Sequence, residues 1–303
     1  MPIKLWEATE DQKNKSNLFK YENFLHKRYK IKFNKNYSKL HDWSIKNPEK
    51  FWNSIWDFSK VKGKKNEKFY KSKELFKNRF FINSKLNFAE NLLSKKDNSK
   101  AITFINENGY KEIRKWNELN LNVGKISFYL KKINIKEKDR VAAYLPNLIE
   151  TVESFLATVS IGAIWSSCSP DFGVNGVIER FAQIKPKVLI LCDRYYYNGK
   201  QINVIDKLKP ILKKIKSIKN VIIINYPGKK HIKFKKNKYV KFEFWKNIKK
   251  LKPKKLEFKR FDFNHELAIL YSSGTTGKPK CICHRSGGVL LQHLKDHQLQ
   301  SEI

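Results

Sequence analysis

The spacing of apolar and polar positions changes along the chain near residue 100. Before that point, Trp and Phe side chains in residues 43–58 recur at spacings of one, three and four, which is typical of an amphipathic helix. Pro48 suits the first turn of that helix, where its missing N–H costs nothing. Residues 1–99 show no sustained alternation of strands and helices, so we expect an N-terminal helical extension there.

After residue 100, short apolar runs alternate with amphipathic segments. The runs predict buried strands at residues 140–145, 163–167, 187–192, 221–225 and 267–271. The first intervening helix is expected to begin at Asn147, with Glu150 completing a capping box, and Gly162 is placed to end it. Strands separated by helices of about a dozen residues indicate βαβ units and a mostly parallel sheet, so the predicted fold class is α/β.

Lysine dominates the charge of this chain. A formal net charge of +36 over 303 residues would normally indicate a nucleic-acid partner, because clustered basic residues release counterions from a phosphate backbone. However, only eight of the 64 basic residues are arginine, the better bidentate reader of phosphates, and the lysines accompany many Asn, Ile, Phe and Tyr residues, as an AT-rich genome would produce. We therefore predict no nucleic-acid partner.

A lysine-dense stretch lies in residues 228–260, interleaved with aromatic residues. We expect an exposed connection whose aromatic side chains pack inward. Stacking of single-stranded nucleic acid on those rings is the alternative interpretation.

Neither a membrane span nor a secretory signal is expected, because no window approaches eighteen uninterrupted apolar residues and the N-terminus has no apolar core before a cleavage site. Cys168, Cys192, Cys281 and Cys283 are too few and too unevenly spaced for a disulfide framework in a chain of this length. We therefore expect reduced thiols and a cytoplasmic protein.

Cys281, Cys283, His293 and His297 form the pattern C-x-C-x9-H-x3-H, which resembles a zinc site only superficially. Zinc fingers place at least two residues between their cysteines and about twelve before the first histidine. On a strand the two cysteines share one face, where we expect them to be buried, so no metal site is predicted. His284 is expected to be a structural residue rather than a catalytic base.

The decapeptide YSSGTTGKPK, residues 271–280, concentrates groups that bind phosphate oxygens. Glycine lets backbone N–H groups face one concavity, hydroxyls add donors, and ammonium groups add charge. It is not a Walker A loop, because Gly274 and Gly277 are separated by two residues rather than four and Pro279 follows Lys278. An ordinary surface turn is the alternative. The candidate phosphate-binding residues are Ser272, Ser273, Gly274, Thr275, Thr276, Gly277, Lys278 and Lys280.

This decapeptide resembles the Gly-rich signature [ST]SGTTGxPK of adenylate-forming enzymes, which include acyl-CoA synthetases, luciferases and peptide-synthetase adenylation domains. Further segments are similar to the acetoacetyl-CoA synthetase family: LNFAENLL (86–93), WNELN (116–120), AIWSSCSPDFG (163–173), YNGK (197–200) and CICHRSGGVLLQHLKDHQL (281–299). The resemblance covers the whole chain but only the front half of such an enzyme.

The resemblance implies an AMP-forming acid–thiol ligase. In that reaction the carboxylate of acetoacetate attacks the α-phosphate of ATP, pyrophosphate leaves, and the thiol of CoA then displaces AMP. The Gly-rich loop would hold the β- and γ-phosphates with Mg²⁺. Contacts to CoA are implied for Arg194, Asn198, Gly199 and Lys200.

The resemblance also implies a domain division, with residues 1–99 as the N-terminal extension. Residues 100–303 would be the first part of the AMP-binding domain, with Rossmann-like βαβ layers that end just after the Gly-rich loop, a truncated version of the adenylate-forming large domain. Family members place further catalytic residues downstream, so the chain alone is expected to be inactive. The alternatives are a synthetase for acetate or propionate, a basic nucleic-acid-binding protein, and an inactive product; the sequence leaves the oligomeric state open.

Overall fold

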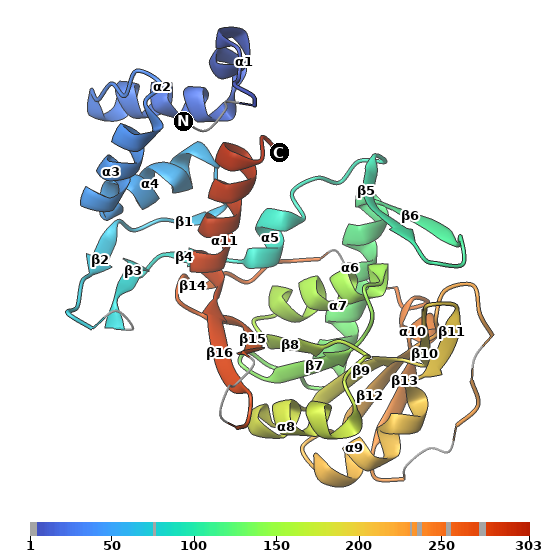
Figure 1. Ribbon diagram of the computed structural model, residues 1–303. Helices are drawn as coiled ribbons and strands as arrows, with labels where there is room; N and C mark the ends of the chain where they lie inside the picture. The colour runs from blue at the N-terminus through green and yellow to red at the C-terminus, as the bar shows by residue number, and fades with distance from the viewer. Residues whose placement is uncertain (1–4, 75–76, 231, 235–237, 253–255, 273–276) are drawn as a thin grey trace. The chain divides into compact units, whose positions relative to one another are not determined.

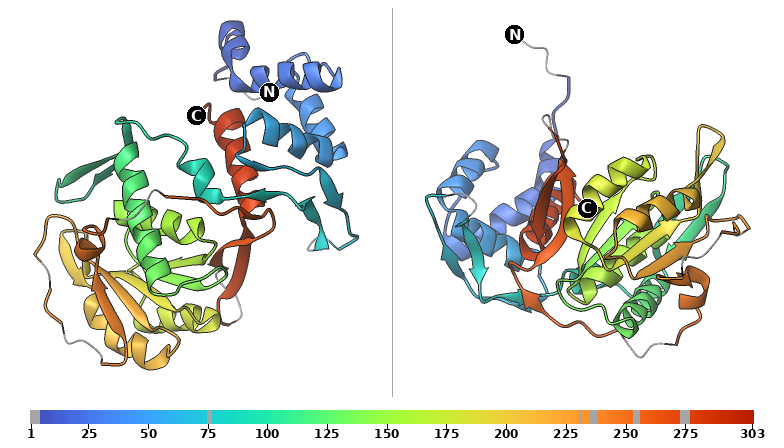
Figure 2. Two further views of the ribbon diagram at one scale, coloured as in Figure 1. Left: turned by 180° about the vertical axis from the view of Figure 1, so that it is seen from behind. Right: turned by 90° about the horizontal axis from the view of Figure 1, so that it is seen from below.

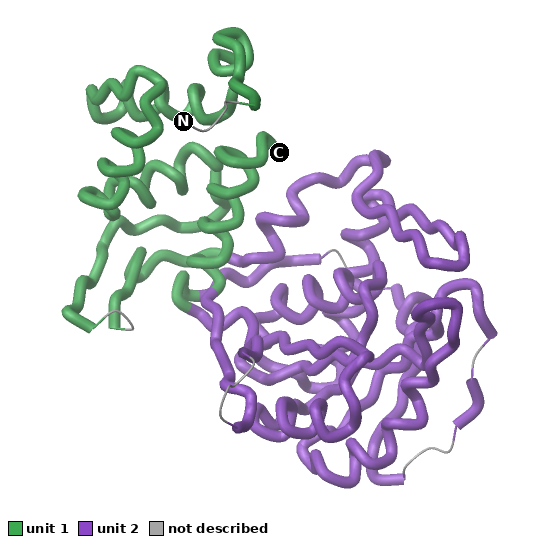
Figure 3. Tube along the Cα trace, in the orientation of Figure 1, with its two compact units in different colours: residues 1–86, 262–264, 286–303 green, residues 87–261, 265–285 purple. Residues whose placement is uncertain are grey.

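The structure is a computed structural model that describes residues 5–74, 77–230, 232–234, 238–252, 256–272 and 277–303. The chain forms two compact units (Figure 3). Unit 1 comprises Met1–Leu86, Asp262–Asn264 and Ser286–Ile303, and unit 2 comprises Asn87–Phe261 and His265–Arg285. The division of the protein into domains 1–99 and 100–303 stays a prediction.

Unit 1 is mainly helical. Its helices are α1 (Glu10–Lys15), α2 (Asn17–Tyr29), α3 (Tyr37–Lys46), α4 (Pro48–Phe58) and α11 (Ser286–Lys295), the last continuing into the π-helix η3 (Asp296–Gln300). Two short antiparallel pairs join β1 (Gly63–Lys64) to β4 (Lys85–Leu86) and β2 (Lys68–Tyr70) to β3 (Arg79–Ile82). Pro48 is the first residue of α4, as predicted. Trp43, which the spacing assigned to the same helix, belongs instead to α3. Helix α3 ends at Lys46, because Asn47, which precedes Pro48, has a non-helical backbone conformation.

Unit 2 is built on a seven-stranded sheet in the order β13-β12-β9-β7-β8-β15-β16. Neighbouring strands are parallel except β15 and β16, which are antiparallel. The strands are β7 (Arg140–Tyr144), β8 (Ile164–Cys168), β9 (Val188–Cys192), β12 (Asn220–Ile224), β13 (Lys241–Phe244), β15 (Glu266–Ser272) and β16 (Lys280–Arg285), and β14 (Phe261–Asp262) precedes β15 in the chain. The mostly parallel α/β sheet predicted from the sequence is confirmed.

Helices cover both faces of this sheet (Figures 1 and 2). One face carries α6 (Trp116–Lys132), α7 (Ile149–Ser160) and α10 (Trp245–Ile248), and the other carries α8 (Val174–Ile184) and α9 (Leu208–Lys214), which continues from the 3₁₀ helix η2 (Ile205–Lys207). The chain steps from β7 to β8 in one direction and from β8 to β9 in the other. Because such crossovers are right-handed, α7 and α8 must lie on opposite faces. The direction changes beside β7, where α/β proteins bind ligands at the carboxyl ends of the strands.

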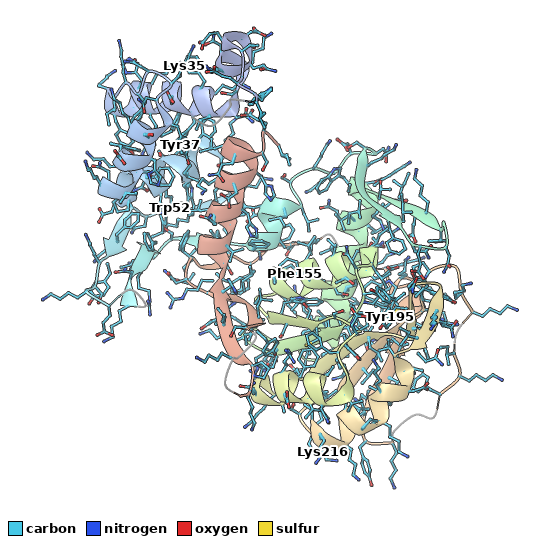
Figure 4. The ribbon with its side chains drawn as sticks, viewed as in Figure 1. Lys35, Tyr37, Trp52, Phe155, Tyr195 and Lys216 are labelled. Carbon is cyan, nitrogen blue, oxygen red and sulfur yellow. The ribbon has the colours of Figure 1, made fainter. Side chains whose placement is uncertain are left out.

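The core of unit 2 lies between the sheet and its helices. Every residue of β9 and β12 is buried. Phe155 of α7, labelled in Figure 4, packs its ring 5.8 Å from that of Phe88 and 5.9 Å from that of Trp165. Phe88 belongs to the short helix α5 (Phe88–Leu92). No helix in the described ranges is long and apolar enough to cross a membrane.

Two local predictions in unit 2 differ from the structure. Helix α7 begins at Ile149 rather than near Asn147, and no side chain caps it as Asn147 was expected to do. The hydroxyl of Thr151 replaces the expected cap, since it lies 3.4 Å from the N–H of Leu148 and donates to the carbonyl of Pro146 at 2.8 Å. Gly162 follows this helix with φ +75°, as its role at the helix end requires.

The lysine-dense stretch 228–260 contributes more than a connection, because it supplies the edge strand β13 and helix α10. Trp245 is buried and the ring of Phe234 lies 5.5 Å from that of Phe242, so these aromatics pack as predicted. Tyr239 is the exception and is 77% exposed.

A buried charge network ties the hairpin of β5 (Lys100–Ile105) and β6 (Lys111–Lys115) to two helices. Arg114 Nε lies 2.8 Å from Glu153 Oε1, and Arg114 Nη2 lies 2.9 Å from Glu112 Oε1. Asn122 of α6 donates to Glu153 at 2.7 Å. Burial raises the pKa of Glu153 to about 7 despite the lowering effect of Arg114 and Asn122.

This raised pKa predicts a pH dependence of stability. The folded state favours the protonated Glu153, so its contribution is fully present below the unfolded pKa of 4.5 and is lost as the pH rises through about 7. Glu153→Gln should remove that loss, which we expect to amount to about 2–3 kcal/mol. Urea unfolding at pH values from 4.5 to 8 measures it, with the exposed Glu179→Gln as the matched control. A pH profile unchanged in Glu153→Gln would contradict the assignment.

Candidate functional site

The Gly-rich stretch is the connection of an antiparallel hairpin at the carboxyl end of β15. Tyr271 pairs with Cys281 and Ser272 with Lys280 at the end of this hairpin. The candidate residues Ser273, Gly274, Thr275 and Thr276 lie outside the described residues. Of the remaining candidates, Ser272 is half-buried and Gly277, Lys278 and Lys280 are exposed.

The described part of the loop combines an unusual backbone conformation with two exposed lysines. Gly277 has φ +131°, a conformation that a residue with a side chain rarely adopts. Neither Lys278 nor Lys280 has an ion-pair partner among the residues that the structure describes. Two ammonium groups are therefore available to an anionic ligand, while the intervening Pro279 is buried and fixes the backbone between them.

The entry to the loop is held by side chains of the neighbouring strand. Ser166 Oγ on β8 lies 2.9 Å from the carbonyl oxygen of Ile269 and 3.0 Å from the hydroxyl oxygen of Tyr271. Burial raises the pKa of Tyr271, so this phenol is neutral at physiological pH. On the other side, the guanidinium carbon of Arg180 lies 4.1 Å from the ring centroid of Phe172 and 5.9 Å from that of Tyr271. The strand thus delivers Ser272 to the carboxyl edge of the sheet in a fixed position.

The second candidate segment leaves the same edge of the sheet, after β9. Strands β10 (Arg194–Tyr197) and β11 (Lys200–Asn203) form an antiparallel hairpin. Asn198 and Gly199 have φ values of +50° and +73°, which is the two-residue turn with left-handed residues that favours Asn-Gly. The N–H of Gly199 donates to Glu107 Oε1 at 3.0 Å, and Lys200 is exposed.

Arg194 lies at the base of this hairpin, not at its tip. It is 8% exposed, and its Nη2 lies 3.1 Å from Asp193 Oδ2, a carboxylate that is itself fully buried. Arg194 Nη1 also donates to Gln201 Oε1 at 3.3 Å, and Nη2 donates to the carbonyl of Lys230. The donors of Arg194 are therefore engaged inside the protein, which supports a structural role more than the predicted contact with CoA.

Sequence reasoning missed a lysine–tyrosine pair between the two candidate segments. Lys207 Nζ donates to Tyr144 Oη and to the carbonyl of Pro170, both at 3.0 Å. Burial is the main cause of the lowered pKa of Lys207 and of the raised pKa of Tyr144. This contact fixes the loop after β8, but no local pattern distinguishes Lys207 from the many other lysines of the chain.

The cysteine prediction was wrong for two thiols. Cys168 and Cys192 are buried, whereas Cys281 and Cys283 are exposed because β16 is the edge strand of the sheet. His284 pairs with Ala268 on β15 and is half-buried. Within the described ranges, no three His, Cys, Asp or Glu side chains cluster closely enough to hold a metal ion.

Known proteins resemble this chain over most of its length. The family model described as AMP-binding enzyme matches residues 92–301. Acetoacetyl-coenzyme A synthetase of Rhizobium meliloti (strain 1021) is 42% identical over 265 residues, which is 86% of this chain and 40% of that protein. Acetoacetyl-CoA synthetase of Gallus gallus is 41% identical over 276 residues, covering 88% of this chain and 41% of the relative.

The solved structure of acetoacetyl-CoA synthetase from Streptomyces lividans has the same fold. It matches with a TM-score of 0.91 at 27% identity, over 100% of this chain and 46% of that chain. The resemblance read from the sequence is thereby confirmed, and the chain spans less than half the length of these relatives.

Proposed function

Because the chain belongs to the AMP-binding enzyme family, we propose that it supplies the phosphate-binding part of a ligase that activates acetoacetate with ATP and transfers it to CoA. The observation that carries this proposal is the hairpin loop at the carboxyl end of β15, with Gly277 in a left-handed conformation and two lysines without ion-pair partners in the described part of the chain. The similarity to acetoacetyl-CoA synthetases supports acetoacetate as the acid.

The groups of the loop suit a leaving pyrophosphate. Ammonium groups of Lys278 and Lys280 neutralise charge on phosphate oxygens, and hydroxyls and backbone N–H groups donate to them. These donors do not suit a bare cation, so Mg²⁺, which neutralises phosphate charge when bound, would be held mainly by the nucleotide and not by these side chains. The work of this part of the chain is therefore to position the nucleotide and to stabilise the charge that develops on its departing end.

The hairpin after β9 is the proposed contact for CoA in the second half-reaction. It leaves the sheet three strands from β15, which corresponds to roughly 14 Å at the usual strand spacing. We expect Lys200→Ala to raise the KM for CoA about fivefold and to leave adenylate formation unchanged, because only the second half-reaction uses CoA.

Arg194→Ala should instead lower the stability of the protein, because it leaves the buried Asp193 without its counter-charge. If Arg194→Ala binds CoA more weakly at unchanged stability, the result would support the predicted contact between Arg194 and CoA.

The proposal is tested by isotope exchange between ATP and pyrophosphate in the full-length gene product. We expect exchange that depends on acetoacetate and Mg²⁺ and does not need CoA. Exchange supported only by acetate or propionate would change the acid but keep the family chemistry. A protein that catalyses no exchange with any acid, yet binds single-stranded nucleic acid in a salt-dependent manner, would overturn the proposal. We also propose that the protein is cytoplasmic and that its partners are small-molecule substrates rather than nucleic acid.

A further inference from the structure

The exit of the Gly-rich loop is tied to helix α8 by one side chain. Gln183, in the last turn of α8, donates from Nε2 to the carbonyl oxygen of Pro279 at 3.0 Å. The same nitrogen donates to the carbonyl oxygen of Glu179, one turn earlier, at 2.8 Å. On its other side, Gln183 Oε1 lies 3.6 Å from Cys281 Sγ, which can donate to it.

These contacts give the amide of Gln183 a single orientation. Its two N–H groups donate to two carbonyl oxygens, and its oxygen accepts from a thiol. If the amide were flipped, its oxygen would point at the two carbonyl oxygens, and neither hydrogen bond could form. The contact to Glu179 anchors the side chain on its own helix. Gln183 therefore acts as a rigid link between α8 and Pro279, although it lies at the surface of the molecule.

Pro279 needs such a link because of its position in the hairpin. The ladder between β15 and β16 ends at the pair Ser272 and Lys280, so Pro279 lies just beyond it. Proline has no N–H to donate, and only its carbonyl oxygen can fix this point of the backbone. The entry of the loop is held by Ser166 on β8, and the exit is held by Gln183 on α8.

We propose that Gln183 is a positioning residue for phosphate binding. By fixing Pro279, it sets the direction of Lys278, the residue immediately before it, and limits how far the exposed part of the loop can move. This inference rests on the proposed function, since it assigns Gln183 to the ATP half-reaction and not to CoA or to the acid. Gln183 contacts the backbone at the exit of the loop, so its effect on the nucleotide passes through Lys278 and Gly277.

The test uses Gln183→Met, which keeps the length of the side chain and removes the hydrogen bonds that its amide makes with Glu179, Pro279 and Cys281. In hydrogen–deuterium exchange on the 303-residue chain, we expect the amides of Gly277, Lys278 and Lys280 to exchange about tenfold faster than in the wild type. In the full-length gene product, the KM for ATP should rise about fivefold, as for the loss of one hydrogen bond, and the KM for acetoacetate should stay the same. Because Gln183 is exposed, the midpoint of thermal unfolding should change little.

Two control variants separate this link from general effects on α8. Glu179→Ala removes an exposed side chain from the same helix but keeps the backbone carbonyl that Gln183 uses, so it should behave like the wild type. Cys281→Ala removes only the thiol contact and should have a smaller effect than Gln183→Met.

Wild-type exchange rates and an unchanged KM for ATP in Gln183→Met would overturn the inference, as would an equal effect in Glu179→Ala. A different result would show that the proposed function itself is wrong. If the wild-type gene product makes no acyl-adenylate, the function is wrong, whereas the exchange rates of the loop amides still decide whether Gln183 fixes the exit.

Discussion

Lys278→Ala in the full-length gene product is expected to lower acetoacetate-dependent ATP–pyrophosphate exchange by about 100-fold or more. Lys278 is exposed on the loop and has no ion-pair partner within the described residues, so its ammonium group is available to the phosphates. Charge that develops on the leaving pyrophosphate would lose a positioned cation. Loss of an interaction made mainly in the transition state lowers kcat more than it raises the KM for ATP. The double variant Thr276→Ala with Lys278→Ala should abolish measurable exchange.

The matched control is Lys216→Ala. Lys216, labelled in Figure 4, is also exposed, but it precedes β12 and so lies toward the opposite, amino edge of the sheet. Its removal changes the net charge by the same amount and should leave exchange unchanged. If both variants lose activity equally, general charge rather than the loop carries the effect. If Lys278→Ala keeps full exchange, the loop does not stabilise the leaving group.

The largest effect on stability is expected for Gly162→Ala. Gly162 has φ +75°, and a Cβ atom there would lie 2.5 Å from two ring carbons of Phe261. The ring of Phe261 stacks on that of His265, with centroids 5.0 Å apart, and His265 Nε2 lies 2.9 Å from the carbonyl oxygen of Gly162. The new methyl group can be accommodated only if these neighbours move. We expect a loss of about 3 kcal/mol in the free energy of unfolding, the sum of the backbone cost and the overpacking cost.

Gly109→Ala isolates the backbone part of that loss. Gly109 also has φ +75°, but nothing lies within 4 Å of the position that its Cβ would occupy. Urea unfolding should therefore show a loss of about 1 kcal/mol for Gly109→Ala. Equal losses at the two glycines would show that the contact with Phe261 contributes nothing.

The sequence by itself determined the α/β class, the order of the parallel strands along the chain and the candidate loop. Each of these depends on local information. Apolar runs become strands because they must be buried, and Gly162 ends a helix because its φ is positive. The decapeptide at 271–280 carries its chemistry in adjacent residues, so its resemblance to a known signature was visible without a structure.

Only the tertiary structure decided which side chains surround that loop and which are already engaged. The tertiary structure shows that Arg194 already pairs with the buried Asp193, although its contact with CoA stays a prediction, and that Cys281, which was expected to be buried, is exposed on the edge strand β16. Gln183 and Pro279 are distant in the chain, and nothing in the sequence around Gln183 indicates that it contacts the loop. The order of strands across the sheet and the direction of single side chains follow from packing between distant segments, which the spacing of residues along the chain does not encode.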